Sequence, residues 1–423
     1  MRLPPPLAPL AAASALLLAA APASASDPTP EDASIGTRPA REASAPVMPA
    51  SAGESVQIVA RADAPAADGP VSPDPPTDWA VLHAGLRPRL GTFGGVATLA
   101  LAHARTERFY GLFSLSAVRN DAGTHVGLAQ LALGRNLADT YAGGAQLSLT
   151  ENRARTFYGV GQFALVYNRA ARVAGLAQAG GYNRARRFAG LVQLAGYNRS
   201  DESFAGVAQV GGFNRARGAF AGLAQLGAVN FAGPDAFDDD EPPPGDGFRG
   251  LLQAGAFNAV DGDFYGALQV GASSLTTGRF AGVAQISALG AYAEHFRGVA
   301  QVGAAAVSKD SYGAQLGATA IALKEHTGLQ LGVACNYAGS VTGAQVGVVN
   351  YAERVRGVQV GLFNHAGSLR GVQIGLANHA EDGVLPWTAL LNMGFGDGDG
   401  GGDTNVDGER VGRLGARRLA RAR

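Results

Sequence analysis

The side chains that could do chemistry in this sequence recur at fixed distances from a glycine. A glutamine follows the glycine by two or three residues and an asparagine comes next, as in GLVQLAGYN from Gly190 to Asn198. A carboxamide both donates and accepts hydrogen bonds, so a row of them could line a polar pore or binding groove. The same amides could instead pair across strands, as buried polar groups require. We favour pairing, which gives structural roles to the repeated glutamines, among them Gln193, Gln209, Gln225, Gln253, Gln345, Gln359 and Gln373.

The repeated asparagines fall where each expected strand ends. Asparagine tolerates left-handed backbone conformations and hydrogen-bonds to the local backbone, so it is typical of turns. This pattern favours a turn-forming role for the repeated asparagines, which include Asn198, Asn214, Asn350, Asn364 and Asn378.

One segment near the C-terminus matches the first half of a calcium-binding loop. Asp403, Asn405 and Asp407 place oxygen ligands at alternate positions, and a glycine follows, as that ion prefers. Leu414 stands where the second half of the loop needs a bidentate glutamate. The three residues are therefore only a weak metal-site candidate, and we predict no cofactor.

Catalytic signatures do not occur in the sequence. The seven histidines are scattered, with no His-x-x-x-His pair and no cluster of cysteine and histidine. No Ser/His/Asp signature or phosphate-binding glycine loop occurs in a strand-to-helix context. The sequence therefore predicts a protein that is not an enzyme.

Composition narrows the class of partner. The 423 residues have a formal net charge of zero and only 16% are charged. Electrostatic capture of nucleic acid or anionic lipid is therefore not expected to dominate binding.

The period of the repeat defines the elements that must position these residues. Anchor glycines run from Gly95 to Gly371 in steps that are mostly 16 residues, then 15 and 14. A helix is disfavoured, because glycine costs about 1 kcal/mol relative to alanine in a helix interior. Each unit is therefore expected to be a strand followed by a charged, water-facing connector such as NRARR, from Asn183 to Arg187.

Connectors of hairpin length predict an all-β fold of tandem 14–16-residue strand–turn repeats. The economical arrangement is a long antiparallel meander closed into a β-barrel, which leaves no exposed strand edges. The alternative is a β-solenoid, in which each unit forms one coil and like residues stack in ladders. The drift of the period from 16 to 14 favours the meander, because a coil is expected to keep a constant cross-section.

The flanking segments differ in composition from the repeat. Residues 1–25 have the basic start, apolar run and small-residue site of a secretory signal peptide. Residues 26–78 form an Ala/Pro/Ser/Asp-rich linker that is expected to be disordered. The β-repeat domain follows over 79–395 with an acidic loop inserted at 231–248, and residues 396–423 form a Gly/Asp-rich and then Arg-rich tail, also expected to be disordered.

The last units resemble a known family. GAQVGVVNYAERVR, GVQVGLFNHAGSLR and GVQIGLANHAEDG, followed by VLPWTALLNMGFG, are similar to the bacterial surface repeat-containing protein family with its tandem G-x-Q-x-G-x-x-N units. The similarity is strongest over 343–395, and earlier units use a looser G-x-x-Q spacing. The resemblance implies a cell-envelope or surface location in a Gram-negative-type bacterium, and it implies no reaction.

These expectations describe an exported, non-enzymatic repeat protein with a structural or interaction role at the bacterial outer membrane or cell surface. One alternative is an outer-membrane pore or transport barrel with a glutamine-lined lumen. Another is a secreted, adhesin-like β-solenoid in the periplasm or medium. The expected partners are outer-membrane lipid or surface ligands, and nucleic acid is not expected.

Overall fold

The computed structural model describes residues 56–58, 77–234 and 246–395, all of which belong to one compact unit, Ser55–Arg423. The signal segment 1–25, nearly all of the linker, residues 235–245 of the acidic insertion and the tail with Asp403, Asn405 and Asp407 lie outside these residues. The strands are β1(Val56–Ile58), β2(Thr77–Gly85), β3(Arg89–Ala100), β4(His103–Tyr110), β5(Phe113–Ser116), β6(Arg119–Ala132), β7(Arg135–Ser148), β8(Glu151–Ala164), β9(Tyr167–Ala205), β10(Ala208–Ala216), β11(Ala219–Ala221), β12(Ala224–Ala232), β13(Asp246–Arg249), β14(Leu252–Val260), β15(Asp263–Tyr265), β16(Leu268–Ala281), β17(Ala284–Val302), β18(Ala305–Val360), β19(Phe363–Ala380) and β20(Trp387–Phe395).

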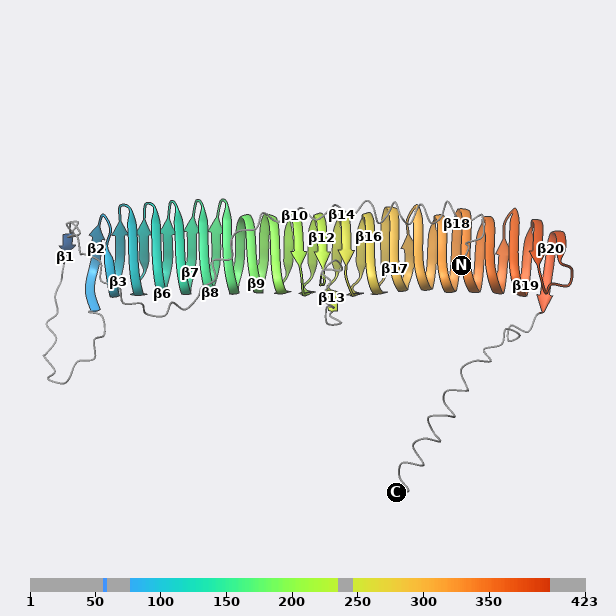
Figure 1. Ribbon diagram of the computed structural model, residues 1–423, viewed down its shortest axis with the longest axis horizontal. Coiled ribbons are helices and arrows are strands. Elements are labelled where there is room, and N and C mark those ends of the chain that lie inside the picture. Colours follow the sequence, from blue (N-terminus) through green and yellow to red (C-terminus); the bar gives the residue numbers. More distant parts are fainter. Residues whose placement is uncertain (1–55, 59–76, 235–245, 396–423) are drawn as a thin grey trace, which may run out of the picture. The chain divides into compact units, whose positions relative to one another are not determined.

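Successive repeats pair in parallel, so the fold is a β-solenoid of about 18 coils (Figure 1). In the pairing of β10 with β9, Gln209 lies opposite Gln193, and Asn214 lies opposite Asn198. The same register continues from β10 to β12 and from β12 to β14. The predicted all-β repeat is confirmed, but the antiparallel meander and its closure into a barrel are wrong. An antiparallel hairpin would reverse each strand and could not bring like residues of adjacent units together.

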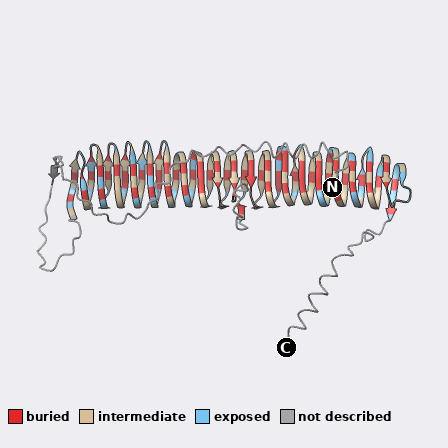
Figure 2. Ribbon diagram, viewed as in Figure 1, coloured by how far each residue is buried: buried red, intermediate tan, exposed pale blue. Residues whose placement is uncertain are grey.

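The coil forms because selected side chains of each repeat point to its interior. In the coil from Asn183 to Asn198, the buried side chains include Asn183, Ala185, Phe188 and Gln193. The intervening residues Arg184, Arg186 and Arg187 face outward as intermediate or exposed positions. Figure 2 shows buried residues recurring in every coil along the unit. One coil therefore has too little interior to be stable alone, and stacking completes its core.

The drift in period does not prevent coiling, and the later, shorter coils differ from the earlier ones in backbone and in core. Coils with the shorter G-x-Q spacing turn on glycines in the left-handed region, with φ of 118° at Gly313 and 145° at Gly371. Their interior is also smaller, since Val341, Val355 and Leu369 replace the phenylalanines of earlier coils. The expectation of a constant cross-section was therefore wrong: the later coils combine positive-φ glycines with smaller core residues and continue the parallel stack.

Each end of the solenoid carries an antiparallel strand. β1 pairs antiparallel with β2, and β20 pairs antiparallel with β19. β20 also extends the interior contacts, because the Asn392 side chain donates a hydrogen bond to Gln373 at 3.3 Å. The C-terminal strand therefore covers the edge that would otherwise accept a further coil.

Candidate functional site

The repeated glutamines form one continuous buried column. From Gln130 to Gln373, each side chain is fully buried. From Gln146 onward, each Nε2 donates to Oε1 of the glutamine in the preceding coil at 2.7–2.9 Å. The column includes all seven glutamines selected from the sequence: Gln193, Gln209, Gln225, Gln253, Gln345, Gln359 and Gln373. Their amides face one another in a filled interior, so they line no lumen, contrary to the pore alternative.

The repeated asparagines also lie inside the coil rather than at surface turns. Asn198 donates to Asn214 Oδ1 at 2.9 Å, and Asn350 donates to Asn364, which donates to Asn378, each at 2.7 Å. Asn198 also donates to the backbone carbonyl of Val210, and Asn350 to that of Val360. The turn assignment was wrong because the residues after each asparagine continue as strand, as within β9. Asparagines donate toward the C-terminus, whereas glutamines donate toward the N-terminus.

A third interior column is aromatic over most of the solenoid. Rings from Phe188 to Phe296 stack with centroids 4.8–5.3 Å apart. His125 occupies the same column between Phe109 and Tyr141, at 4.5 and 5.0 Å. Neither of its ring nitrogens has a hydrogen-bond partner, and burial lowers its pKa to about 3. The ring therefore packs as a neutral core residue, with no contact to a surface site.

The interior columns leave the outer surface as the place where coils differ. The first position after the column asparagine is arginine in five consecutive coils: Arg153, Arg169, Arg184, Arg199 and Arg215. Adjacent parallel strands lie about 4.8 Å apart, so these arginines form a row along the solenoid axis. Residues 152–217 hold ten arginines and two carboxylates, a local charge of +8 in a chain whose net charge is zero. The sequence expectation of weak electrostatics was based on the net charge of the whole chain, in which the acidic remainder cancels the charge of this segment.

The two carboxylates neutralise only the later coils of this arginine face. Asp201 pairs with Arg184 at 2.9 Å and with Arg199 at 2.6 Å. Glu202 pairs with both Arg186 and Arg187. Burial opposes ionisation of Asp201, but hydrogen bonds from Arg199 and Arg184 outweigh it and lower its pKa. The two acids thus hold four arginines in place.

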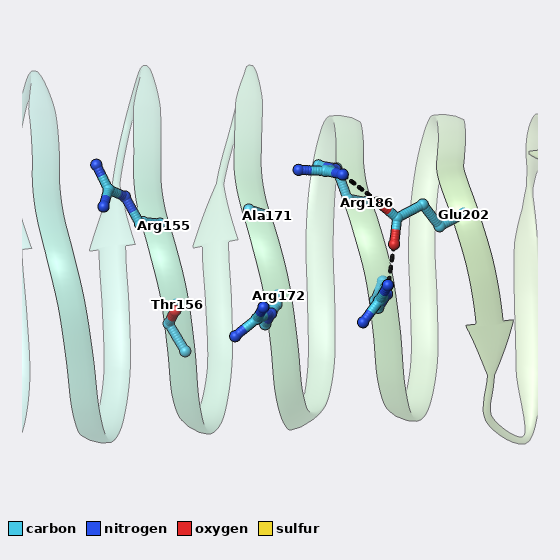
Figure 3. A pocket seen from close by; sticks show the side chains of 7 residues that line it. Arg155, Thr156, Ala171, Arg172, Arg186 and Glu202 are labelled. Atoms are coloured by element: carbon cyan, nitrogen blue, oxygen red, sulfur yellow. Dashed lines mark hydrogen bonds and ion pairs between the residues drawn. The ribbon is translucent and has the colours of Figure 1, made fainter. Parts of the chain in front are cut away.

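A groove of about 210 Å³ lies beside these ion pairs, lined by Arg155, Thr156, Ala171, Arg172, Arg186, Arg187 and Glu202. Figure 3 shows the labelled Arg155 and Arg172 projecting from the coils that precede Arg186 and Glu202. Within the described residues, Arg153, Arg155, Arg169 and Arg172 form no ion pair or hydrogen bond through their side chains. Arg155 and Arg172 therefore bring to the groove positive charge that the protein itself does not neutralise, and Arg153 and Arg169 precede them by two and three residues outside its lining. We define these four residues as the open arginines.

A different part of each coil exposes apolar side chains. The residues after the column glutamine, such as Leu131, Leu133, Leu147 and Leu149, line a shallow groove that continues to Leu165. The Leu165 side chain is 71% exposed. A similar groove in the late coils is lined by Val346, Val360, Ile374 and their neighbours. The solenoid thus has an apolar face and, over residues 152–217, a strongly basic one.

The described part of the chain offers little to a metal ion. It contains no group of three or more His, Cys, Asp or Glu side chains that could hold one. His365 and His379 stack with their rings 4.9 Å apart, and their Nδ1 atoms lie 2.9 Å apart in a hydrogen bond. In the described ranges, no helix is long and apolar enough to cross a membrane.

Fold and surface together define a parallel β-solenoid with a filled polar and aromatic core and an arginine-lined outer groove. Searches of protein-family models, curated proteins and solved structures returned no match for this chain. The arginine groove was not predicted from the sequence, because NRAAR and NRARR were interpreted as separate turns. Aligning the units on their asparagines would have revealed the row of arginines.

Proposed function

We propose that this chain is a non-enzymatic, exported β-solenoid that serves as an extended interaction scaffold at the bacterial cell surface or in the secreted fraction. The observation that carries the proposal is that the interior of the coils is constant, whereas their outer surface varies. Glutamine, asparagine and aromatic columns occupy the interior from coil to coil, whereas charge and apolarity vary on the outside. Solenoids present long surfaces for binding, and here the outer side chains can vary from coil to coil without changing the core. Such a surface suits extended partners.

Two features of the sequence support the location. Residues 1–25 have the layout of a secretory signal, and the units over 343–395 resemble a bacterial surface repeat family. The filled interior favours this reading over a transport barrel, because the column glutamines from Gln130 to Gln373 are buried.

Cell fractionation with surface proteolysis tests the proposal. The full chain with an epitope inserted between residues 235 and 245 is expected in the envelope or medium, with its signal removed, and to be cleaved by protease added to intact cells. A matched chain lacking residues 2–25 is expected to remain inside the cell and to be protected. Retention of the full chain in the cytoplasm with an uncleaved N-terminus would overturn the proposal.

A further inference from the structure

We propose that the arginine face over residues 152–217, which includes the groove lined by Arg155, Arg172, Arg186 and Arg187, binds a linear acidic polysaccharide through carboxylate, sulfate or phosphate groups spaced along the polymer. The inference rests on the proposed function as a binding scaffold and names the partner class of one of its faces. Four observations support it: the uncompensated charge, the internal carboxylate in the groove, the linear spacing of the arginines and the covered aromatic rings.

The first observation is that the basic charge is uncompensated. Like charges directly opposite one another on adjacent strands destabilise a sheet. The open arginines Arg153 and Arg169 lie opposite each other in the pairing of β8 with β9. No carboxylate among the described residues pairs with either of them. A bound anion would relieve this repulsion, and the face is therefore better suited to the bound state than to the free one.

The second observation is that the protein contains an internal example of the expected contact. The Glu202 carboxylate forms ion pairs with the guanidinium groups of both Arg186 and Arg187. Figure 3 shows its position beside the labelled Arg186. Asn168 and Asn183 are hydrogen-bonded neighbours in the asparagine column, so Arg172 and Arg187, each four residues later, occupy equivalent positions. Arg172 lies in the same groove as this ion pair but lacks a carboxylate of its own. An external carboxylate, sulfate or phosphate fits beside it, because guanidinium groups match such anions in a bidentate geometry.

The third observation concerns the shape of the charge. The arginines that follow the column asparagines repeat about every 4.8 Å along the row, the spacing of adjacent parallel strands. Arg199 is the buried member of this row and pairs with Asp201. A straight row of cations suits an extended chain that carries an anion at regular intervals. A membrane surface would be bound more typically through large apolar side chains inserted beside the basic ones. Thr156 and Ala171 are the uncharged residues of this groove, and neither provides such an anchor.

The fourth observation distinguishes a polysaccharide from a single-stranded nucleic acid. A row of Tyr167, Tyr182, Tyr197 and Phe213 runs beside the arginines, two positions before them in each coil. Nucleic-acid-binding grooves use the open faces of such rings to stack bases. Here the rings stack on one another at 4.8 Å between centroids. Because the ring faces within this row are covered, recognition depends on the anionic groups.

Binding of the purified full chain to polygalacturonate and to dextran sulfate tests the inference, with neutral dextran as the uncharged polymer. Four substitutions, Arg153→Gln, Arg155→Gln, Arg169→Gln and Arg172→Gln, are expected to weaken binding by about tenfold to a hundredfold, since each exposed charge contact contributes modestly. The matched control removes four exposed charges elsewhere, as Arg279→Gln, Arg297→Gln, Lys324→Gln and Arg354→Gln, and is expected to change binding less than about twofold to threefold. Far-UV circular dichroism verifies that both variants remain folded.

A gain-of-function variant keeps the test independent of folding losses. Glu202→Gln releases Arg186 and Arg187 and is expected to tighten polysaccharide binding by about threefold or more. Higher salt is expected to weaken binding in every variant, because bound counterions are released from the polymer.

Several outcomes would overturn the inference. These are no binding to either acidic polymer in about 0.1 M salt, equal losses in the two quadruple variants, or tighter binding to phosphatidylglycerol vesicles or single-stranded DNA than to the polysaccharides. The assay uses purified protein and does not depend on cellular location. Its failure would therefore leave the surface-scaffold proposal standing, and failure of the fractionation test would leave the binding result standing.

Discussion

At the scale of single residues, the buried hydrogen bonds of the glutamine column are expected to contribute to stability. Gln225 donates to Gln209 and accepts from Gln253, each at 2.9 Å. Gln225→Met keeps similar length but leaves a buried acceptor on Gln209 and a buried donor on Gln253 without partners. Each such group costs about 1–3 kcal/mol, so we expect the free energy of unfolding in urea to fall by about 2–5 kcal/mol.

The control for this prediction is Leu223→Ala, two residues earlier, where the side chain is 52% exposed. It is expected to change the free energy of unfolding by less than about 0.5 kcal/mol. If the two variants unfolded at the same urea concentration, the amide column would contribute nothing specific to stability.

A second residue-scale prediction concerns pH. Burial lowers the pKa of His125 to about 3 and that of His326 to about 4. An unfolded histidine has a pKa near 6.5, so below that pH the unfolded chain gains protons that the folded chain does not. Stability is therefore full above pH 6.5 and falls as the pH drops, by about 2 kcal/mol per histidine at pH 5.

His125→Phe extends the aromatic stack and removes two ring nitrogens without hydrogen-bond partners. We expect this variant to be more stable than the parent chain and to gain more at pH 5 than at pH 7.5, as measured by thermal unfolding. Tyr141→Phe, the next ring in the stack, is the control and is expected to leave the difference between the two pH values unchanged. An unaltered pH dependence in His125→Phe would contradict the assignment of this histidine as neutral.

At the scale of elements, the antiparallel strand β20 limits growth of the solenoid. Its residues from Trp387 to Phe395 pair with β19, and Asn392 completes the glutamine column at Gln373. Truncation after Gly383 uncovers a parallel strand edge with an unpaired row of amides, and such edges recruit further strands. We expect this truncated chain to form oligomers or fibrils, detected by light scattering after size exclusion and by thioflavin fluorescence.

Truncation after Phe395 is the matched control, because it removes the tail and keeps β20. This shorter chain is expected to elute as the full chain does. Identical behaviour of the two truncations would show that β20 has no protective role.

Several elements could be predicted from the sequence, and others could not. Repeat length and β character followed from the glycine spacing and from strand-like units such as FAGLVQLAGYN. Parallel pairing did not follow, because a connector such as NRARR has hairpin length and its asparagine has turn propensity. The structure instead places this segment within β9 with Asn183 buried. The register of Gln209 with Gln193 shows that the pairing is parallel. The positive φ at Gly313, in a coil with the shorter G-x-Q spacing, is likewise a tertiary property.

The arginine groove illustrates the same limit. Arg172 and Arg187 are 15 residues apart in the sequence, and nothing local indicates that they share a groove. Parallel stacking places them in adjacent coils, where Glu202 joins Arg187 in an ion pair. The residue types were evident in the sequence, but their assembly depends on the pairing direction.

At the scale of the whole molecule, stability is expected to add coil by coil, because each coil contacts mainly its neighbours. Deletion of residues 207–222 removes 16 residues and brings Gln193 against Gln225 in the same register. We expect a folded, slightly less stable chain that retains its circular dichroism spectrum. Deletion of only residues 207–214 moves outward residues into the core and is expected to abolish cooperative unfolding in urea. Equal damage from both deletions would contradict a modular solenoid.

The insertion after Phe231 shows what such a molecule can tolerate. Gln225 and Gln253 are 28 residues apart in the chain, yet their amides meet at 2.9 Å, as do those of Asn230 and Asn258. The interior hydrogen bonds between these two coils therefore do not depend on the length of the chain segment that joins them. A foreign peptide grafted between residues 235 and 245 is therefore expected to leave the hydrogen bonds of Gln225 with Gln253 and of Asn230 with Asn258 intact.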